Sequence, residues 1–181
     1  MNIARRFLKF LEPHVLKAEI AGSLRRRNKE VGDIEVVCVE RGDMPLQNVF
    51  TNDFPGIVVN GPRLKRFKYK NPEVQLELYI TNPTDFGRIL AIRTGSSAYS
   101  HFLAVVWNRR GWAGTKEGLR RKKECEKKGS VWRIKKEFAL KPTMPPPFYT
   151  EADFFQFLGI DWIPPEERNW KSTEARYNWD V

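Results

Sequence analysis

Three acidic residues in the first half of the sequence have the spacing of a metal-binding site. Asp33 and Glu35 are two residues apart at the start of an apolar run, 34–39, so both carboxylates leave one face of the predicted strand. Glu77 is the only acidic residue on its face of a second run, 74–80. Carboxylates about 4 Å apart repel by about 4 kcal/mol at intermediate dielectric, so such a cluster favours bound cations. Oxygen ligands prefer Mg²⁺ or Mn²⁺, and two such ions can stabilise the attacking and leaving oxygens of phosphoryl transfer.

A Gly-Ser turn precedes the first two carboxylates. Gly22 allows the backbone to approach a ligand closely, and Ser23 at a helix start offers N–H groups and a hydroxyl to an anion. Arg25 and Arg26 follow, and guanidinium groups form charge-assisted hydrogen bonds with phosphate oxygens. The turn therefore predicts a phosphate site beside the carboxylates.

The charge distribution points to nucleic acid. The chain has 32 Lys and Arg against 22 Asp and Glu, a net charge of +10. Residues 105–141 hold 13 of the basic residues and only 4 acidic ones, interleaved with Trp107, Trp112 and Trp132. Basic surfaces bind phosphate backbones through counterion release, and aromatic rings offer stacking faces for bases.

The remaining composition is that of a folded protein outside the membrane. Hydrophobic residues make up 41% of 181 residues, and no apolar run approaches the roughly 20 residues of a membrane helix. Cys38 and Cys125 lack metal-ligand spacing, so we expect a reducing compartment, and Cys38 reads as a core residue of its strand. The expected location is cytoplasmic, with a nuclear or viral setting as an alternative.

Apolar spacing predicts the elements of the first half. A helix is expected at residues 3–11, and strands are expected at 15–21, 34–39, 57–60, 66–70 and 74–80. The strand at 34–39 is apolar enough to be buried on both faces. Residues 41–55 carry turn-forming residues and predict an exposed excursion.

The second half predicts helices and a mixture of short strands and turns. Helices are expected at 84–92, at 97–110 and at 151–158, the last with Thr150 as its N-cap and Gly159 as its end. A boundary near residue 94 divides the chain into the predicted domains 1–94 and 95–181, and residues 170–181 read as a loose tail. The fold class expected is α+β.

These motifs resemble those of family X DNA polymerases, the relatives of polymerase beta. Gly22-Ser23-x-Arg25-Arg26 followed by Gly32-Asp33-Ile34-Glu35 resembles the nucleotidyltransferase motif of that family. Leu76-Glu77-Leu78 resembles the strand with the third carboxylate, and Thr94-Gly95-Ser96 resembles the family's threonine-glycine-serine turn. Residues 154–168, Phe-x-x-Leu-Gly followed by Pro-Pro-x-x-Arg, resemble its C-terminal signature. The resemblance spans roughly residues 15–168.

The resemblance implies a mixed-sheet palm domain at 1–94, a smaller basic thumb-like subdomain at 95–181, and a role for each site residue. Asp33, Glu35 and Glu77 would hold two Mg²⁺ ions, or Mn²⁺, and Glu77 would help to deprotonate a primer 3′-hydroxyl. Nucleotide contacts are expected from Gly22, Ser23, Arg26, Gly32, Thr94, Gly95 and Ser100. Nucleic-acid contacts are expected from His101, Arg109, Arg110, Lys116, Arg120 and Arg121.

The implied function is addition of dNTPs to a DNA 3′ end, in gap filling or repair, by a protein reduced to a palm and thumb-like core and acting as a monomer. The few residues before Gly22 favour such a minimal core. Two departures keep alternatives open. The family usually has aspartate where this sequence has Glu35 and Glu77, and Ala104 stands where an arginine often contacts the template. The alternatives are template-independent tailing, an RNA or protein acceptor, and a non-catalytic nucleic-acid-binding descendant.

Overall fold

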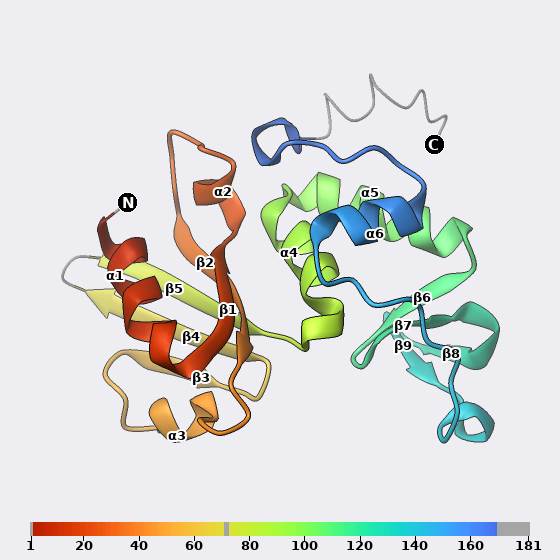
Figure 1. Ribbon diagram of the computed structural model, residues 1–181, viewed down its shortest axis with the longest axis horizontal. Helices are drawn as coiled ribbons and strands as arrows, with labels where there is room; N and C mark the ends of the chain where they lie inside the picture. The colour runs from red at the N-terminus through yellow and green to blue at the C-terminus, as the bar shows by residue number, and fades with distance from the viewer. Residues whose placement is uncertain (1, 71–72, 170–181) are drawn as a thin grey trace.

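The computed structural model describes residues 2–70 and 73–169 and has an α+β fold with two sheets. One half of the molecule holds the first sheet and helix α1 (Asn2–Leu11). The other half holds the second sheet and helices α4 (Phe86–Thr94), α5 (Ser97–Arg109) and α6 (Glu151–Leu158). Figure 1 shows α6, from the end of the chain, beside α4 and α5. The predicted fold class is confirmed.

The first sheet has five strands in the order β1-β2-β5-β4-β3. Their bounds are β1 Val15–Ile20, β2 Asp33–Glu40, β3 Ile57–Asn60, β4 Leu64–Lys70 and β5 Glu73–Ile80. Only β2 and β5 run parallel among these pairs; the other neighbours are antiparallel. The central pair is therefore the one that carries the three predicted carboxylates.

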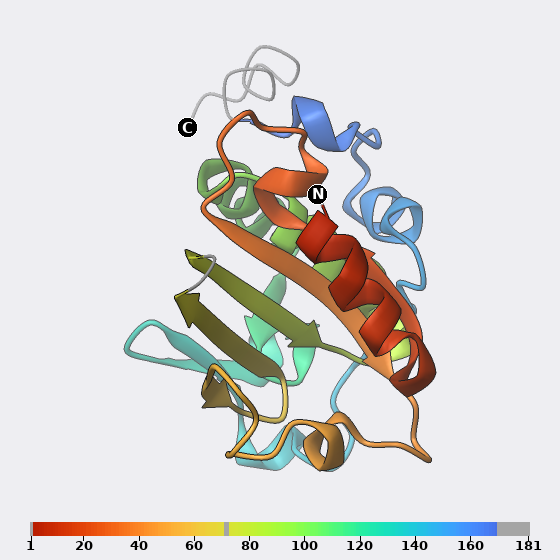
Figure 2. The same ribbon diagram turned by 90° about the vertical axis from the view of Figure 1, so that its left-hand side faces the viewer.

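Alternation along β2 and β5 gives the sheet two buried faces, as the sequence predicts. Ile34, Val36 and Cys38 pack on one face in a core with α1, and Val37 and Val39 pack on the other with α4. Figure 2 shows α1 lying along the first of these faces. Asp33 and Glu35, at the start of β2, are on the same face as Val37 and Val39.

The segment 41–55 differs from its prediction as an exposed excursion. It contains helix α3 (Leu46–Val49), and the side chains of Leu46 and Phe50 have no exposed surface. Phe50 packs against Phe54 and Phe67, with ring centroids 4.8 and 5.0 Å away. The turn-forming residues in this segment do occur at turns, but the apolar residues between them close the edge of the core.

The second sheet is built from short strands in the order β7-β6-β9-β8. Their bounds are β6 Trp112–Thr115, β7 Gly118–Arg121, β8 Cys125–Lys128 and β9 Val131–Ile134. Short 3₁₀ helices join several elements: η1 Glu12–His14, η2 Pro83–Asp85, η3 Lys122–Glu124, η4 Lys136–Phe138 and η5 Pro165–Glu167. The mixture of strands and turns expected here is confirmed.

Helix α6 begins and ends where its sequence predicts. Thr150 and Asp153 form a reciprocal capping box, and Gly159 ends the helix in the left-handed region at φ 56°. Phe154, Phe155 and Leu158 are buried in a core shared with α5. The backbone of α6 also approaches α4 closely, because a Cβ on Gly87 would lie 1.9 Å from the Thr150 carbonyl oxygen.

Two further sequence expectations can be compared with the structure. Cys38 is buried, as expected of a core residue, and Cys125 is buried as well. Within the described ranges no helix combines the length and apolar character needed to cross a bilayer. The predicted tail at 170–181 lies outside the described residues, and the boundary near residue 94 stays a prediction.

Candidate active site

The β2–β5 register brings the three predicted carboxylates to one face of the sheet. In this parallel pair Asp33 is opposite Gln75, and Glu35 is opposite Glu77. Residues directly opposite each other point to the same side, so all three acids share the face that α4 covers farther along. A carboxyl of Glu77 on the far side of the sheet would have ruled out a shared site, and the register excludes that arrangement.

The electrostatics of Asp33 and Glu35 are those of crowded acids. Burial, followed by repulsion from Asp33, raises the pKa of Glu35 from its usual value to about 7. Burial, followed by repulsion from Glu77, also raises the pKa of Asp33. Both shifts mean that this face of the sheet disfavours negative charge. A cation bound between these carboxylates would remove the repulsion.

Glu77 is held by neighbours on its own sheet. Nε of Arg66 and Nε2 of Gln75 donate to its Oε1 at 2.6 and 3.1 Å, and the Tyr79 hydroxyl donates to its Oε2. Arg93 lies over the Tyr79 ring, 3.9 Å from its centroid, and donates to the Tyr79 oxygen at 3.2 Å. The carboxylate of Glu77 is thus oriented by a guanidinium on one side and a phenol on the other.

The donor chemistry fits a hard divalent ion, although the side chains do not form a closed set of ligands. Within residues 2–70 and 73–169, no group of three His, Cys, Asp or Glu side chains converges closely enough to hold a metal. The three acids supply only oxygen donors on one face of the sheet. Burial and repulsion between the acids raise the pKa values of Asp33 and Glu35, and a bound cation would favour their charged forms. To complete a site, Glu77 must turn away from Arg66 and Tyr79.

The Gly22-Ser23 turn sits directly against Glu35. Helix α2 (Gly22–Arg25) starts with Gly22 at φ 61°, and a Cβ there would lie 2.0 Å from Oε2 of Glu35. The missing side chain therefore creates the space that the Glu35 carboxylate occupies. The hydroxyl of Ser23 is buried and has no hydrogen-bond partner among the described residues. An unpaired buried hydroxyl at this turn matches the predicted phosphate contact.

Arg25 and Arg26, the two arginines after the turn, form hydrogen bonds with other groups of the protein. Nη1 of Arg25 donates to Oγ1 of Thr94 at 2.6 Å, and the same guanidinium binds both oxygens of Glu151 at 2.8 and 2.9 Å. Nη1 of Arg26 donates to the Thr94 carbonyl at 2.7 Å. Both guanidinium groups are thus engaged by protein groups, and the predicted phosphate contacts of Arg25 and Arg26 stay predictions. Arg25 ties the first sheet to α4 and α6.

Glu151 is the buried centre of this tie, and sequence reasoning missed it. Its carboxylate also accepts two hydrogen bonds from Arg168, at 2.5 and 3.0 Å, and Arg168 has no exposed surface. Burial alone would raise the pKa of Glu151, but hydrogen bonds from Arg168 and Arg25 lower it on balance. Glu151 reads in the sequence as an ordinary first-turn acid of a helix. Only its two arginine partners, 17 and 126 residues away, reveal its role.

The other predicted nucleotide contacts differ in how accessible they are. Gly32 is exposed beside Asp33, but Thr94 has no exposed surface and its side chain faces Arg25. Gly95 packs closely on Tyr99, and the Ser100 hydroxyl donates to the Ile92 carbonyl at 2.6 Å. In this arrangement Thr94 and Ser100 use their hydroxyls within the protein, so a nucleotide would meet the backbone of this turn.

Most of the predicted nucleic-acid contacts lie on the surface. His101, Arg109, Arg110 and Lys116 are exposed. Arg121 is half-buried and lies over the Trp112 ring, 4.2 Å from its centroid. They do not form one face: Arg109 lines a pocket beside the β8–β9 hairpin, and Lys116 lines a cleft between the two halves.

Arg120 is different from the other members of this group. It is 6% exposed, and its Nη1 donates to the Leu119 carbonyl at 2.7 Å. Like Lys116, it lines the cleft of about 840 Å³ between the two halves. Its alternation with Arg121 along β7 explains this, since neighbouring residues of a strand point to opposite sides. A direct contact from Arg120 to a bound duplex is therefore not supported.

The three tryptophans of the basic segment also separate. Trp107 and Trp112 are 7% and 5% exposed and belong to the core of the second half, so they offer no stacking face. Trp132 is half-buried and lines a surface pocket. The sequence could not distinguish them, because all three lie in the same basic segment.

Comparison with known families matches the second half of the chain. Residues 89–169 match the family model of the DNA polymerase beta thumb. A search of curated proteins finds no match. The chain thus resembles family X polymerases over its matched residues, 89–169. The three carboxylates lie before the matched range.

Proposed function

We propose that this protein is a nucleotidyltransferase that adds nucleotides to the 3′ end of DNA, with Mg²⁺ or Mn²⁺ as cofactor. The β2–β5 register carries the proposal, because it gives Asp33, Glu35 and Glu77 one shared face. The Gly22-Ser23 turn supports it from one side, with a buried hydroxyl that lacks a partner among the described residues. The thumb match supports DNA as the macromolecular substrate.

In this proposal each side chain has a defined task. Asp33, Glu35 and Glu77 would hold the divalent ions, which when bound would supply Lewis acidity and neutralise charge on the phosphates. Ser23 and the N–H groups of the turn bind the phosphates that leave as pyrophosphate. Glu77, on the side of the cluster next to Arg66 and Tyr79, receives the proton of the primer 3′-hydroxyl. The hydroxyl oxygen forms a bond to the nucleotide phosphorus as the bond to pyrophosphate breaks.

Exposed basic residues of the second half would hold the DNA. Arg109, Arg110 and Lys116 are exposed there and can neutralise backbone phosphates without ordering a buried group. Such contacts are independent of sequence, which suits an enzyme that must extend any 3′ end.

The test is a primer-extension assay with Mg²⁺ or Mn²⁺, with and without a template strand, and with dNTPs against NTPs. We expect incorporation that is lost in Asp33→Asn, since an amide cannot replace the anionic ligand. Asp53→Asn is the matched control, because Asp53 is an exposed acid in the 41–55 segment, outside the carboxylate cluster. Incorporation without a template would identify the activity as template-independent tailing. Transfer to RNA or protein would identify that molecule, and not DNA, as the acceptor.

A second candidate is a DNA-binding protein without transferase activity. The observation that favours it is the engagement of both Glu77 oxygens by Arg66, Gln75 and Tyr79. The same assay separates the two candidates. Duplex binding with no incorporation under either metal, in wild type and Asp33→Asn alike, would assign the second and refute the first.

A further inference from the structure

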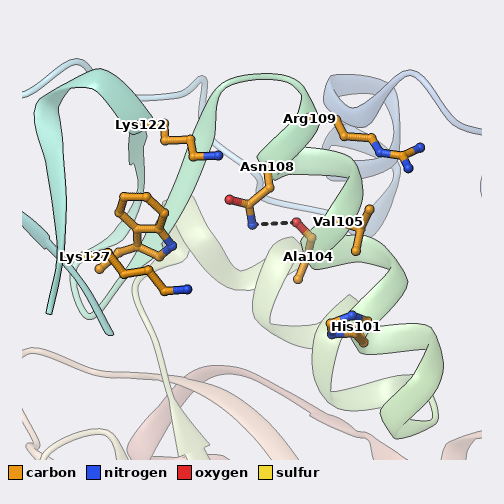
Figure 3. A pocket seen from close by; sticks show the side chains of 8 residues that line it. His101, Ala104, Val105, Asn108, Arg109, Lys122 and Lys127 are labelled. Atoms are coloured by element: carbon orange, nitrogen blue, oxygen red, sulfur yellow. Dashed lines mark hydrogen bonds between the residues drawn. The ribbon is translucent and has the colours of Figure 1, made fainter. Parts of the chain in front are cut away.

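A pocket of about 450 Å³ lies on the outer side of α5, facing the β8–β9 hairpin. Its volume is within the roughly 300–1,000 Å³ range typical of small-molecule sites. Figure 3 shows His101, Asn108 and Arg109 on α5, with Lys122 and Lys127 across the opening. The pocket is separate from the carboxylate cluster, which lies on the first sheet.

The lining of this pocket combines an aromatic ring with several cations. Lys127 and Trp132 are direct cross-strand partners in the β8–β9 pair, so both side chains leave the same face of the hairpin. Nζ of Lys122 lies 5.6 Å from the centroid of the Trp132 ring. Arg109 and His101 stand on the opposite wall, and no Asp or Glu is among the residues that line the pocket. The site therefore attracts anions while presenting a flat apolar face.

The chemistry of a nucleotide matches both properties. A base that displaces the Lys122 side chain from the Trp132 ring can stack there, and its flanking phosphates can then bind Lys122 and Lys127. Asn108 adds a polar group at the wall: its Nδ2 donates to the Ala104 carbonyl at 2.9 Å, which orients the side-chain carbonyl towards the Lys122 side. A base inside a duplex has both of its faces stacked on neighbours, so the pocket favours a base that lies outside a duplex.

The position of the pocket along α5 relates it to the acceptor end. Helix α5 starts after Ser96, in the turn whose Thr94 contacts Arg25 and Arg26 beside the carboxylates. At about 1.5 Å per residue, His101 lies about 7 Å along the helix from this turn, and Arg109 about 20 Å. The pocket therefore lies within one helix length of the turn beside the carboxylate cluster, a distance that a short single strand can span.

We propose that the pocket between α5 and the β8–β9 hairpin binds an unpaired nucleotide of a single-stranded DNA segment next to the acceptor end, with its base stacked on Trp132. The assignment of the strand rests on the proposed function, and it makes DNA with a recessed 3′ end and a single-stranded overhang the preferred substrate. Lys122 and Lys127 hold the phosphates on either side of the stacked base.

The test is a binding experiment that needs no catalysis. Fluorescence anisotropy of labelled DNA is measured with EDTA and without nucleotides, on a recessed duplex with a six-nucleotide 5′ overhang and on a blunt duplex. Stacking contributes enough per base that Trp132→Leu should weaken overhang binding about 5- to 100-fold, with little effect on the blunt duplex. Trp132→Phe should retain most of the affinity, and Tyr149→Leu, an exposed aromatic outside the pocket, should behave as wild type.

A change in the DNA tests the same contact without altering the protein. Abasic residues are placed one at a time along the overhang, and we expect weakened wild-type binding at one or two adjacent positions. In Trp132→Leu those positions should carry no penalty, because the stacking partner is gone. Lys122→Gln and Lys127→Gln should each lower the salt slope by about 0.7.

An abasic scan without effect, or an equal penalty in wild type and Trp132→Leu, would overturn the proposal. So would equal affinity of the wild type for overhang and blunt DNA. None of these outcomes depends on nucleotide incorporation, so a failure of the proposed enzyme activity is measured separately.

Discussion

Removal of the Glu151 carboxylate should destabilise the fold strongly. This carboxylate accepts four hydrogen bonds, two from Arg25 and two from Arg168. Glu151→Ala removes all four and leaves two guanidinium groups without their anion. The side chain of Arg25 is 19% exposed and can recover water, whereas Arg168 has no exposed surface and cannot. The penalty therefore comes mainly from a buried, uncompensated charge.

The expected magnitude is about 3–5 kcal/mol in the free energy of unfolding, the usual cost of removing one partner of a buried pair. For a chain of this length, each kcal/mol lowers the melting temperature by about 2–4 °C, which gives a decrease of about 6–20 °C. Thermal unfolding followed by circular dichroism measures this change. Glu126→Ala is the matched control, because Glu126 pairs with Lys128 at 2.9 Å on the exposed surface. Solvent screens that exposed pair, so the control variant should melt close to the wild-type temperature.

The same contacts predict how the penalty depends on pH. The two arginines hold the pKa of folded Glu151 below its usual value despite burial. A lowered folded pKa means that the stabilisation is complete above the unfolded pKa, near 4.5, and disappears as the pH falls through the folded value. The difference between wild type and Glu151→Ala should thus shrink in acid. Melting temperatures of Glu151→Ala and Glu126→Ala within 2 °C of each other at neutral pH would refute this reasoning.

Three further predictions concern the carboxylate cluster. Gly22→Ala should abolish nucleotide incorporation while DNA affinity is retained, because the new Cβ displaces the Glu35 carboxylate; full activity in extension assays would contradict this. Saturating Mg²⁺ should stabilise the wild type by about 1–3 kcal/mol, and EDTA should reverse the effect, whereas Asp33→Asn should show no thermal shift with the metal. Tyr79→Phe removes one of the groups that hold Glu77, so it should lower the Mg²⁺ concentration needed for half-maximal stabilisation by about two- to tenfold, at about 0.5–1.5 kcal/mol per hydrogen bond. An unchanged midpoint would show that the phenol does not compete with the ion.

Local patterns in the sequence were sufficient for the strands of the first sheet and for the common face of Asp33 and Glu35, whereas the position of Glu77 beside them came from the β2–β5 register. Alternation has a period of two, so the orientation of Asp33 and Glu35 follows from their spacing. The Thr150 cap and the Gly159 end of α6 likewise depend only on residues within one turn. The α+β class and the likeness to family X polymerases could therefore be inferred from the sequence.

Only the tertiary structure decided which charged and aromatic side chains are available to a ligand. Arg25 is of a residue type that often binds phosphate, but its guanidinium donates to Glu151, 126 residues later in the sequence. Trp107, Trp112 and Trp132 lie within one basic segment, yet only Trp132 reaches the pocket. Such outcomes depend on packing between distant elements, because burial and hydrogen bonding are set by whatever element lies opposite. A pattern of residues that are close in sequence does not show which distant element packs against them.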